Sequence, residues 1–181
     1  MKGPSFVLTG TLVRLRAVEP EDADALWRWS NDPEVMRWLV NGYPTSLAYQ
    51  RKRVERREPN SYERVTFMID RLSDGRTIGV VVLRDATPEM GRAEIDIYIG
   101  ERDCWNGGYG TETMRMICRY GFDKMRLHSI ELTVVAEHVA AHHVYEKVGF
   151  VDEGRLREAF RRDGTWHDVI VMGLLEHELV D

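Results

Sequence analysis

Apolar and polar side chains alternate along this chain with two different periods, one typical of strands and one typical of helices. The strand pattern, with its β-branched composition, is found at 12–18, 65–69, 77–83, 93–99 and 129–135, and two further strands are expected after Phe150, turning at Asp163-Gly164. The alternation is strict over 93–99, which makes this the clearest of the predicted strands.

Helices are predicted between these strands from start signals, stop signals and the helical spacing of apolar residues. They are expected to open at Pro20-Glu21-Asp22 and break at Asn31-Asp32-Pro33, to include a short piece over 34–39, to run from a cap at Pro44-Thr45-Ser46 to about Glu58, and to cover 108–123 and 140–148. The order of elements predicts an α/β fold: a central mixed sheet with helices on both faces.

The overall composition fits one globular domain, which we expect to span residues 1–181. A formal net charge of −5 disfavours nucleic acid as a partner and tolerates cationic amines. The run Arg51–Arg57 has two interpretations, a nucleic-acid patch or a solvated helix face, and its flanking acids favour the second.

Targeting and redox signals favour a cytoplasmic protein. No apolar run is long enough to span a bilayer, and the segment 1–8 lacks the apolar stretch of a secretory signal. Cys104 and Cys118 are the only cysteines, too few for a disulfide framework. We therefore expect no membrane association.

The segment 94–112 contains the strongest chemical signal. A strand leads into Trp105-Asn106-Gly107-Gly108-Tyr109-Gly110, and an amphipathic helix follows. Its expected buried face, from helical spacing, is Met114, Ile117, Cys118, Gly121, Phe122 and Met125. Glycines at a helix start let an anion approach the exposed amides, where the helix dipole favours a phosphate. The segment lacks the lysine of a Walker loop and the third glycine of a dinucleotide fingerprint, so an anion site and a purely structural turn both remain possible.

Two motifs in order resemble the GNAT superfamily of N-acetyltransferases. The glycine-rich loop is similar to its acyl-CoA signature, with Gly108 and Gly110 matching and Trp105 in place of a polar residue. Tyr145-Glu146-Lys147-Val148-Gly149-Phe150 matches the ending of its second motif. His138 stands where the family usually has an asparagine.

The resemblance is nearest to the RimJ/RimL-like branch and covers almost the whole chain. It rests on three further segments: Leu8–Arg16, Asn31–Trp38 and Gly164–Asp168. It implies a GNAT-like fold and transfer of an acetyl group from acetyl-CoA to a primary amine, by direct attack in a ternary complex. The implied cofactor-binding residues are Ile97, Tyr98, Ile99, Trp105, Asn106, Gly107, Gly108, Tyr109, Gly110, Thr111, His138 and Lys147.

Three residues are candidates for proton transfer. Glu94 and Asp96 lie two apart on one strand and therefore share a face, so either is a candidate base for the amine, with Glu94 favoured by the resemblance. They could also be a hydrated strand face. The resemblance makes Tyr145 the acid that protonates the thiolate, although its side chain could equally pack in the core. Backbone amides of 97–99 are expected to stabilise charge on the thioester oxygen.

Several other residues have competing interpretations. Glu112 is expected to support the helix dipole. His138 and His142 have the i, i+4 spacing of metal ligands, but no third ligand has suitable spacing, so no metal site is expected. Cys118 is expected in the core, and a covalent acetyl-cysteine at Cys104 is not expected. The tryptophans at 27, 29 and 38 either line an acceptor pocket or pack.

The acceptor stays open at this point. A protein N-terminal amine and a small amine, such as a polyamine or an aminoglycoside, are both compatible with the sequence. An acyl-CoA-binding module without turnover is the alternative from another functional class. A homodimer is compatible with the resemblance, and nothing in the sequence tests it.

Overall fold

The structure, a computed structural model, describes residues 7–39 and 43–180. The segment 1–8 is predicted not to be a secretory signal, and its residues 1–6 lie outside the described residues. The strands are β1 (Val7–Thr9), β2 (Val13–Arg16), β3 (Val65–Arg71), β4 (Thr77–Thr87), β5 (Arg92–Ile99), β6 (Ser129–Val135), β7 (Val151–Arg162) and β8 (Thr165–Leu175). The α-helices are α1 (Ala23–Ser30), α2 (Leu47–Glu55), α3 (Tyr109–Asp123) and α4 (Val139–Val148), with single 3-10 turns at Pro20–Asp22, Arg102–Cys104 and Glu176–Glu178.

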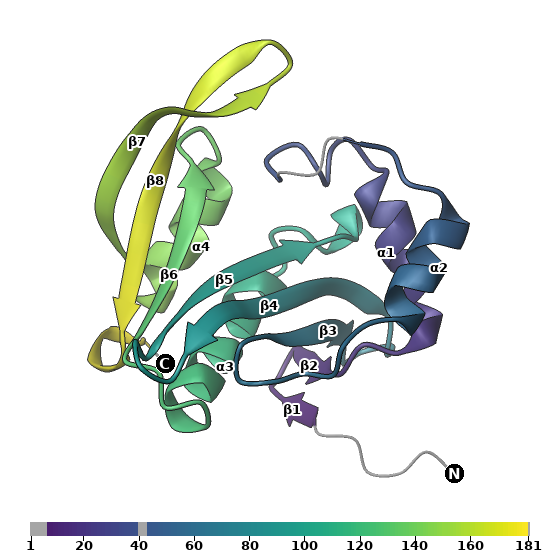
Figure 1. The fold of residues 1–181 in the computed structure, drawn as a ribbon, viewed down its shortest axis with the longest axis horizontal. Coiled ribbons are helices and arrows are strands. Elements are labelled where there is room, and N and C mark those ends of the chain that lie inside the picture. The colour runs from purple at the N-terminus through teal and green to yellow at the C-terminus, as the bar shows by residue number, and fades with distance from the viewer. Residues whose placement is uncertain (1–6, 40–42, 181) are drawn as a thin grey trace.

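The described strands form one mixed sheet in the order β1-β2-β3-β4-β5-β6-β8-β7 (Figure 1). Neighbouring strands are antiparallel except β5 and β6, which are parallel. Helix α3 connects these two parallel strands, as a parallel pair requires a crossover. The predicted mixed α/β fold is confirmed.

Helices cover both faces of the sheet because the central strands are apolar on both sides. Met68 and Val80 pack with Trp29 of α1 in one cluster. Their sequence neighbours Phe67 and Val81 point to the opposite face and pack in the main core, which includes the buried side of α3. The predicted buried face of α3 is confirmed, since its residues Met114, Ile117, Cys118, Gly121 and Phe122 are all buried.

The sheet divides where β5 and β6 separate. The two strands pair only from Arg92 to Glu94, opposite Ser129 to Glu131. Beyond this point β6 continues beside β8, and Figure 1 shows β6, β7 and β8 with α4 diverging from the β1–β5 half as a separate arm. The described residues of β5 from Asp96 onward therefore have no strand partner on the β6 side.

Most predicted elements are confirmed, and two are wrong in part. The strand predicted over 12–18 is shorter, and β1 pairs with it across a turn at 10–12. The helical piece predicted over 34–39 is a series of turns. The Asp32 carboxylate accepts from the backbone of Glu34 and Val35, as a helix N-cap does, but the backbone bonds that follow shift from i−4 to i−3 partners, so no regular helix forms.

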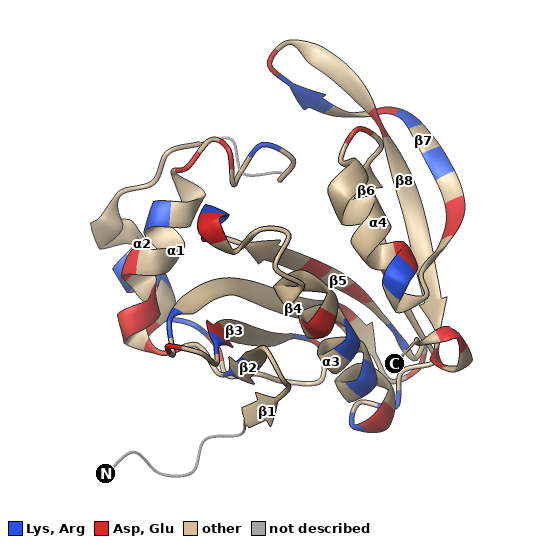
Figure 2. Cartoon of the chain, turned by 180° about the vertical axis from the view of Figure 1, so that it is seen from behind, with Lys and Arg blue, Asp and Glu red and all other residues tan. Residues whose placement is uncertain are grey.

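The basic run Arg51–Arg57 lies on an exposed surface of α2 and the residues after it, and Arg51 pairs with Asp24 of α1. Acidic and basic residues are interspersed over α1 and α2 (Figure 2). This placement agrees with the solvated-face interpretation. Among the described residues, no helix is long and apolar enough to cross a membrane.

We expect Gly149→Ala to be strongly destabilising. Gly149 ends α4 with φ 113°, and an added Cβ would stand 2.1 Å from the backbone oxygen of Glu178. Left-handed strain and the backbone clash together should lower the free energy of unfolding by about 3 kcal/mol. Urea denaturation of the purified variant measures this change.

Gly154→Ala is the matched control, because a Cβ there meets nothing within 4 Å. Its effect should stay within about 0.5 kcal/mol. Equal effects at the two positions would contradict the assignment of Gly149 as a required glycine.

Candidate active site

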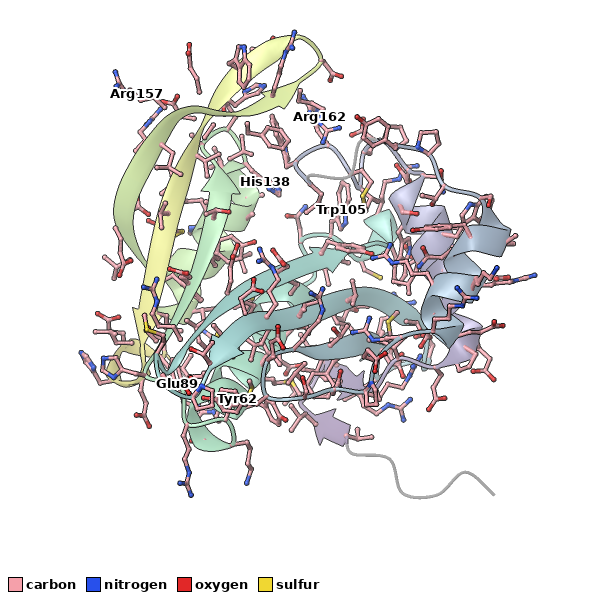
Figure 3. The ribbon with its side chains drawn as sticks, viewed as in Figure 1. Tyr62, Glu89, Trp105, His138, Arg157 and Arg162 are labelled. Carbon is pink, nitrogen blue, oxygen red and sulfur yellow. The ribbon has the colours of Figure 1, made fainter. Side chains whose placement is uncertain are left out.

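A cleft of about 690 Å³ opens where β5 and β6 separate, a volume typical of small-molecule sites. Its lining combines the end of β5, the loop before α3, one side of α4 and the segment between α1 and α2. Every residue predicted to contact the cofactor lines this cleft: Ile97, Tyr98, Ile99, Trp105, Asn106, Gly107, Gly108, Tyr109, Gly110, Thr111, His138 and Lys147. Figure 3 shows Trp105 and His138 on opposite sides of the opening, with Tyr62 and Glu89 far away.

The start of α3 has the geometry of an anion site. Gly108 is its N-cap and has φ 81°, a left-handed conformation that glycine adopts without strain. A Cβ on Gly110, in the first turn, would meet no protein atom within 4 Å, so this side of the helix is open. The first-turn amides of a 15-residue helix are therefore accessible to a pyrophosphate. The residues present fit the phosphate end of coenzyme A.

Trp105 holds the loop against the strand. Its indole Nε1 donates to the backbone oxygen of Ile99 at 2.8 Å, and the ring remains 41% exposed at the cleft. The aromatic residue therefore fixes the loop relative to β5 while presenting a ring to the cleft.

Glu112 does more than support the helix dipole. From the first turn of α3, its carboxylate accepts backbone N–H groups of Thr11, Leu12 and Val13 at 2.7–2.8 Å, and the Thr11 hydroxyl also donates to it. Burial opposes ionisation of this carboxyl, but the hydrogen bonds outweigh it and lower the pKa of Glu112. A Cβ on Gly10 would stand 2.8 Å from this carboxyl, so the turn leaves space for it. Glu112 therefore fixes the β1–β2 turn to the start of α3.

Glu94 and Asp96 do share one face of β5, as predicted, but neither lines the cleft. Arg84 of the neighbouring strand binds both, with Nε 2.6 Å from Asp96 and Nη2 on Glu94. Partial burial raises the pKa of Glu94, and the charge of Asp96 adds to this while Arg84 opposes it. Glu94 lies at the last residue pair joining β5 to β6, whereas Asp96 lies where the strands have separated.

Tyr145 lines the cleft from α4 and also packs on the core, with its ring 6.1 Å from that of Phe150. Burial raises the pKa of Tyr145 to about 12, and the negative charge of Asp96 contributes. The phenol therefore stays protonated at neutral pH and can donate a proton.

The two histidines with metal-ligand spacing and the two cysteines lie in different environments. His138 lines the cleft, and its partial burial lowers its pKa, which favours the neutral imidazole. His142 instead lies 2.8 Å from Asp152. Within residues 7–39 and 43–180, no group of three potential metal ligands comes together. Cys118 is buried in the core as expected, and Cys104 is buried and accepts from Arg71.

The segment between α1 and α2 contributes cleft residues that the sequence did not resolve. Trp38 lines the cleft, whereas Trp29 is buried and Trp27 donates to the Thr45 backbone. The three tryptophans therefore have different roles, which their spacing could not separate.

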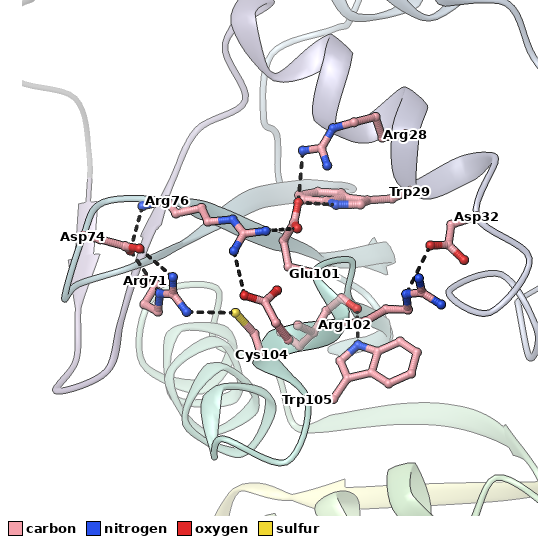
Figure 4. A network of polar contacts seen from close by, with 12 residues as sticks. Arg28, Trp29, Asp32, Arg71, Asp74, Arg76, Glu101, Arg102, Cys104 and Trp105 are labelled. Carbon is pink, nitrogen blue, oxygen red and sulfur yellow. Dashed lines mark hydrogen bonds and ion pairs between the residues drawn. The ribbon is translucent and has the colours of Figure 1, made fainter.

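A polar network around Glu101 was missed entirely. This buried carboxylate accepts from the Trp29 indole at 2.9 Å and pairs with Arg28 and Arg76 (Figure 4). Burial raises its pKa, but these donors together lower it. Because Glu101 begins the segment that leads to Trp105, the network connects α1 to the loop before α3.

Comparison with known proteins agrees with this geometry. The family described as the acetyltransferase (GNAT) domain matches residues 13–151 of the chain. An uncharacterised N-acetyltransferase, p20 of Bacillus licheniformis, is 30% identical over 91% of this chain and 93% of its own length. Spermidine N(1)-acetyltransferase of Escherichia coli K12 is 29% identical over 92% of this chain and 87% of its own.

Solved structures share the fold. A spermidine N-acetyltransferase from Vibrio cholerae, in complex with CoA and spermine, superposes with a TM-score of 0.81 at 25% identity, covering 93% of this chain and 98% of that one. A GNAT acetyltransferase from Bacillus anthracis has a TM-score of 0.82 at 23% identity, covering 96% and 100%. The latter supports the fold alone.

Gly108→Ala should weaken coenzyme A binding by about tenfold, because left-handed strain of about 1–2 kcal/mol would distort the start of α3. Gly164→Ala is the matched control, since Gly164 has the same φ of 81° and open surroundings but does not line the cleft. Isothermal titration with coenzyme A measures both variants. An equal loss of affinity for Gly164→Ala and Gly108→Ala would contradict this account of the loop.

Glu112→Gln should destabilise the protein at pH 7, and this difference should shrink in acid. The folded-state pKa of Glu112 is lowered from 4.5, so its carboxylate contributes stability above that pH and loses it as the pH falls through the folded value. Thermal melts from pH 7 to pH 3 measure the difference, with Glu89→Gln at an exposed position as the control. A difference that stays constant down to pH 3 would exclude a charged role.

Proposed function

The chain belongs to the GNAT acetyltransferase family, and on that premise we propose that it transfers the acetyl group of acetyl-CoA to the primary amine of a small molecule. The observation that carries this proposal is the cleft between β5 and β6, which gathers every predicted cofactor contact and Tyr145. The segments Leu8–Arg16, Asn31–Trp38 and Gly164–Asp168 support assignment to the RimJ/RimL-like branch.

The first task of the protein is to hold the cofactor. We assign the pyrophosphate to the first-turn amides of α3. Further contacts with the cofactor are assigned to the ring of Trp105, in the loop before α3, and to His138 and Lys147 on the α4 side of the cleft. When bound, acetyl-CoA supplies a thioester carbonyl that an amine nitrogen can attack directly. The C–N bond then forms as the C–S bond breaks.

The second task is to remove a proton from the amine, because an alkylammonium with pKa ~10 is not a nucleophile. Glu94 and Asp96 are the candidate bases, acting directly or through water. The raised pKa of Glu94 makes it the stronger base, while Asp96 stands nearer the opening between the strands. Arg84 binds both carboxylates and holds them in one orientation.

The third task is to stabilise the charge that develops on oxygen and sulfur. Backbone N–H groups over 97–99 are the proposed donors to the carbonyl oxygen, because β6 has left this edge of β5. The Tyr145 phenol is the proposed donor to the thiolate. Its raised pKa keeps the proton available across the working pH range.

A small amine is supported by the relatives. Several curated relatives are spermidine N(1)-acetyltransferases, with 27–29% identity over most of this chain. A ribosomal N-acetyltransferase relative is more distant, at 24% identity. A protein N-terminus is therefore kept as one arm of the substrate panel.

We expect Tyr145→Phe to lower kcat by about 10²-fold with little change in the KM for acetyl-CoA, because it removes one proton donor and keeps the ring. Free-thiol release is measured against small amines, aminoglycosides and an N-terminal peptide. Tight acetyl-CoA binding with no thiol release from any acceptor would instead favour the binding-module alternative.

Glu94→Gln and Asp96→Asn are controls for each other, because both side chains bind Arg84. Only substitution of the residue that acts as the base should lower kcat/KM by about 10²-fold. The rate of the base variant should also lose the dependence on pH that reports the carboxyl. If both variants keep the wild-type profile, neither carboxylate is the base.

A further inference from the structure

Four rings meet at the end of the cleft where the β7–β8 arm approaches the segment between α1 and α2. The indole of Trp38 lies 5.4 Å from the His167 ring, 6.1 Å from the His138 ring and 6.4 Å from Phe160, measured between centroids. Arg162 of β7 donates to the backbone oxygen of Leu39 and so joins the arm to this segment. Figure 3 shows Arg162 beside the opening that His138 and Trp105 border.

This end of the cleft is suited to the acceptor. The proposed cofactor contacts come from the end of β5, from residues 105–111 before and within the first turn of α3, and from the α4 side. The remaining lining residues include Glu34, Val35, Arg37, Trp38 and Leu39, all from the segment after α1. Trp38 is half-buried, so part of its ring is available to a molecule in the cleft.

The charges at this end do not suit a polyamine. Among the described residues that line the cleft, Glu34 is the one carboxylate, against Arg37 and Lys147. Each ammonium group that such an acceptor buries needs a charged or hydrogen-bonding partner, and a carboxylate is the strongest of these.

Two nearby carboxylates outside this lining already have arginine partners, and a third lies beside a histidine. Asp96 is bound by Arg84, and Asp32 lies 3.5 Å from Arg102. Glu137 lies 3.1 Å from His167. One face of Trp38 already carries a cation, since the Arg37 guanidinium carbon lies 5.2 Å from its ring centroid. A second cation over the same ring would be repelled.

From this arrangement, and resting on the proposed function, we propose that the acceptor is an arylalkylamine: a primary amine joined by a short chain to an aromatic ring, with no second positive charge. The ring packs against Trp38, where offset or edge-to-face contacts with aromatic rings are favourable. The amine then extends toward the opening between β5 and β6. Trp38 is in this view the residue that selects the acceptor, not a catalytic residue.

The test compares kcat/KM for 2-phenylethylamine, butylamine and spermidine, by thiol release from acetyl-CoA. We expect wild type to prefer 2-phenylethylamine over each of the others by tenfold or more. Trp38→Ala should reduce the preference over butylamine to threefold or less, mainly through the KM of the aromatic amine, while Trp38→Phe keeps most of it.

Trp166→Ala is the matched control, because Trp166 is an exposed tryptophan of β8 that does not line the cleft. It should leave the preference unchanged, and titration with coenzyme A shows whether each variant keeps a folded cofactor site. A tenfold preference for spermidine, no preference for the aromatic ring, or a preference that survives Trp38→Ala would overturn this proposal and leave the transferase function standing. Absence of thiol release with any amine would overturn both.

Discussion

The end of backbone pairing between β5 and β6 after Glu94 is the constraint on which the site depends. Two parallel strands that continued side by side would satisfy each other's N–H and C=O groups and leave no room between them. Here β6 instead follows β8, and the free edge of β5 faces a cleft. Polar backbone groups at such an edge need partners, and a ligand that donates and accepts hydrogen bonds can supply them.

Keeping the strands apart requires that the surrounding elements be fixed, and long-range polar contacts do this. Glu101 joins the end of β5 to α1 through the Trp29 indole and Arg28. Trp105 returns to the Ile99 backbone, so the loop before α3 is held from both ends. On the other side, α4 ends at Gly149, whose surroundings leave no space for a side chain. The cleft is thus bounded by elements with little freedom to close it.

The sequence predicted those features whose signal is local. The helical spacing of Met114, Ile117 and Cys118 identified the buried face of α3. The family resemblance carried by the glycine loop and the Tyr145 motif named many, though not all, of the residues that line the cleft. What it missed depends on contacts between distant residues. Nothing near Glu112 indicates a turn about 100 residues earlier, and the role of Trp38 is defined by rings from α4 and the β7–β8 arm. The helix predicted over 34–39 is instead a series of turns, because the backbone bonds there shift from i−4 to i−3 partners.

The attachment of Glu112 to the β1–β2 turn has an electrostatic consequence for the neighbouring phosphate site that we propose. A bare carboxylate in the first turn of α3 would repel a pyrophosphate bound at the same helix start. Three backbone N–H dipoles and the Thr11 hydroxyl point at this carboxylate and disperse its charge. The edge hairpin therefore screens this acidic residue from the pyrophosphate that we propose to bind at the same helix start.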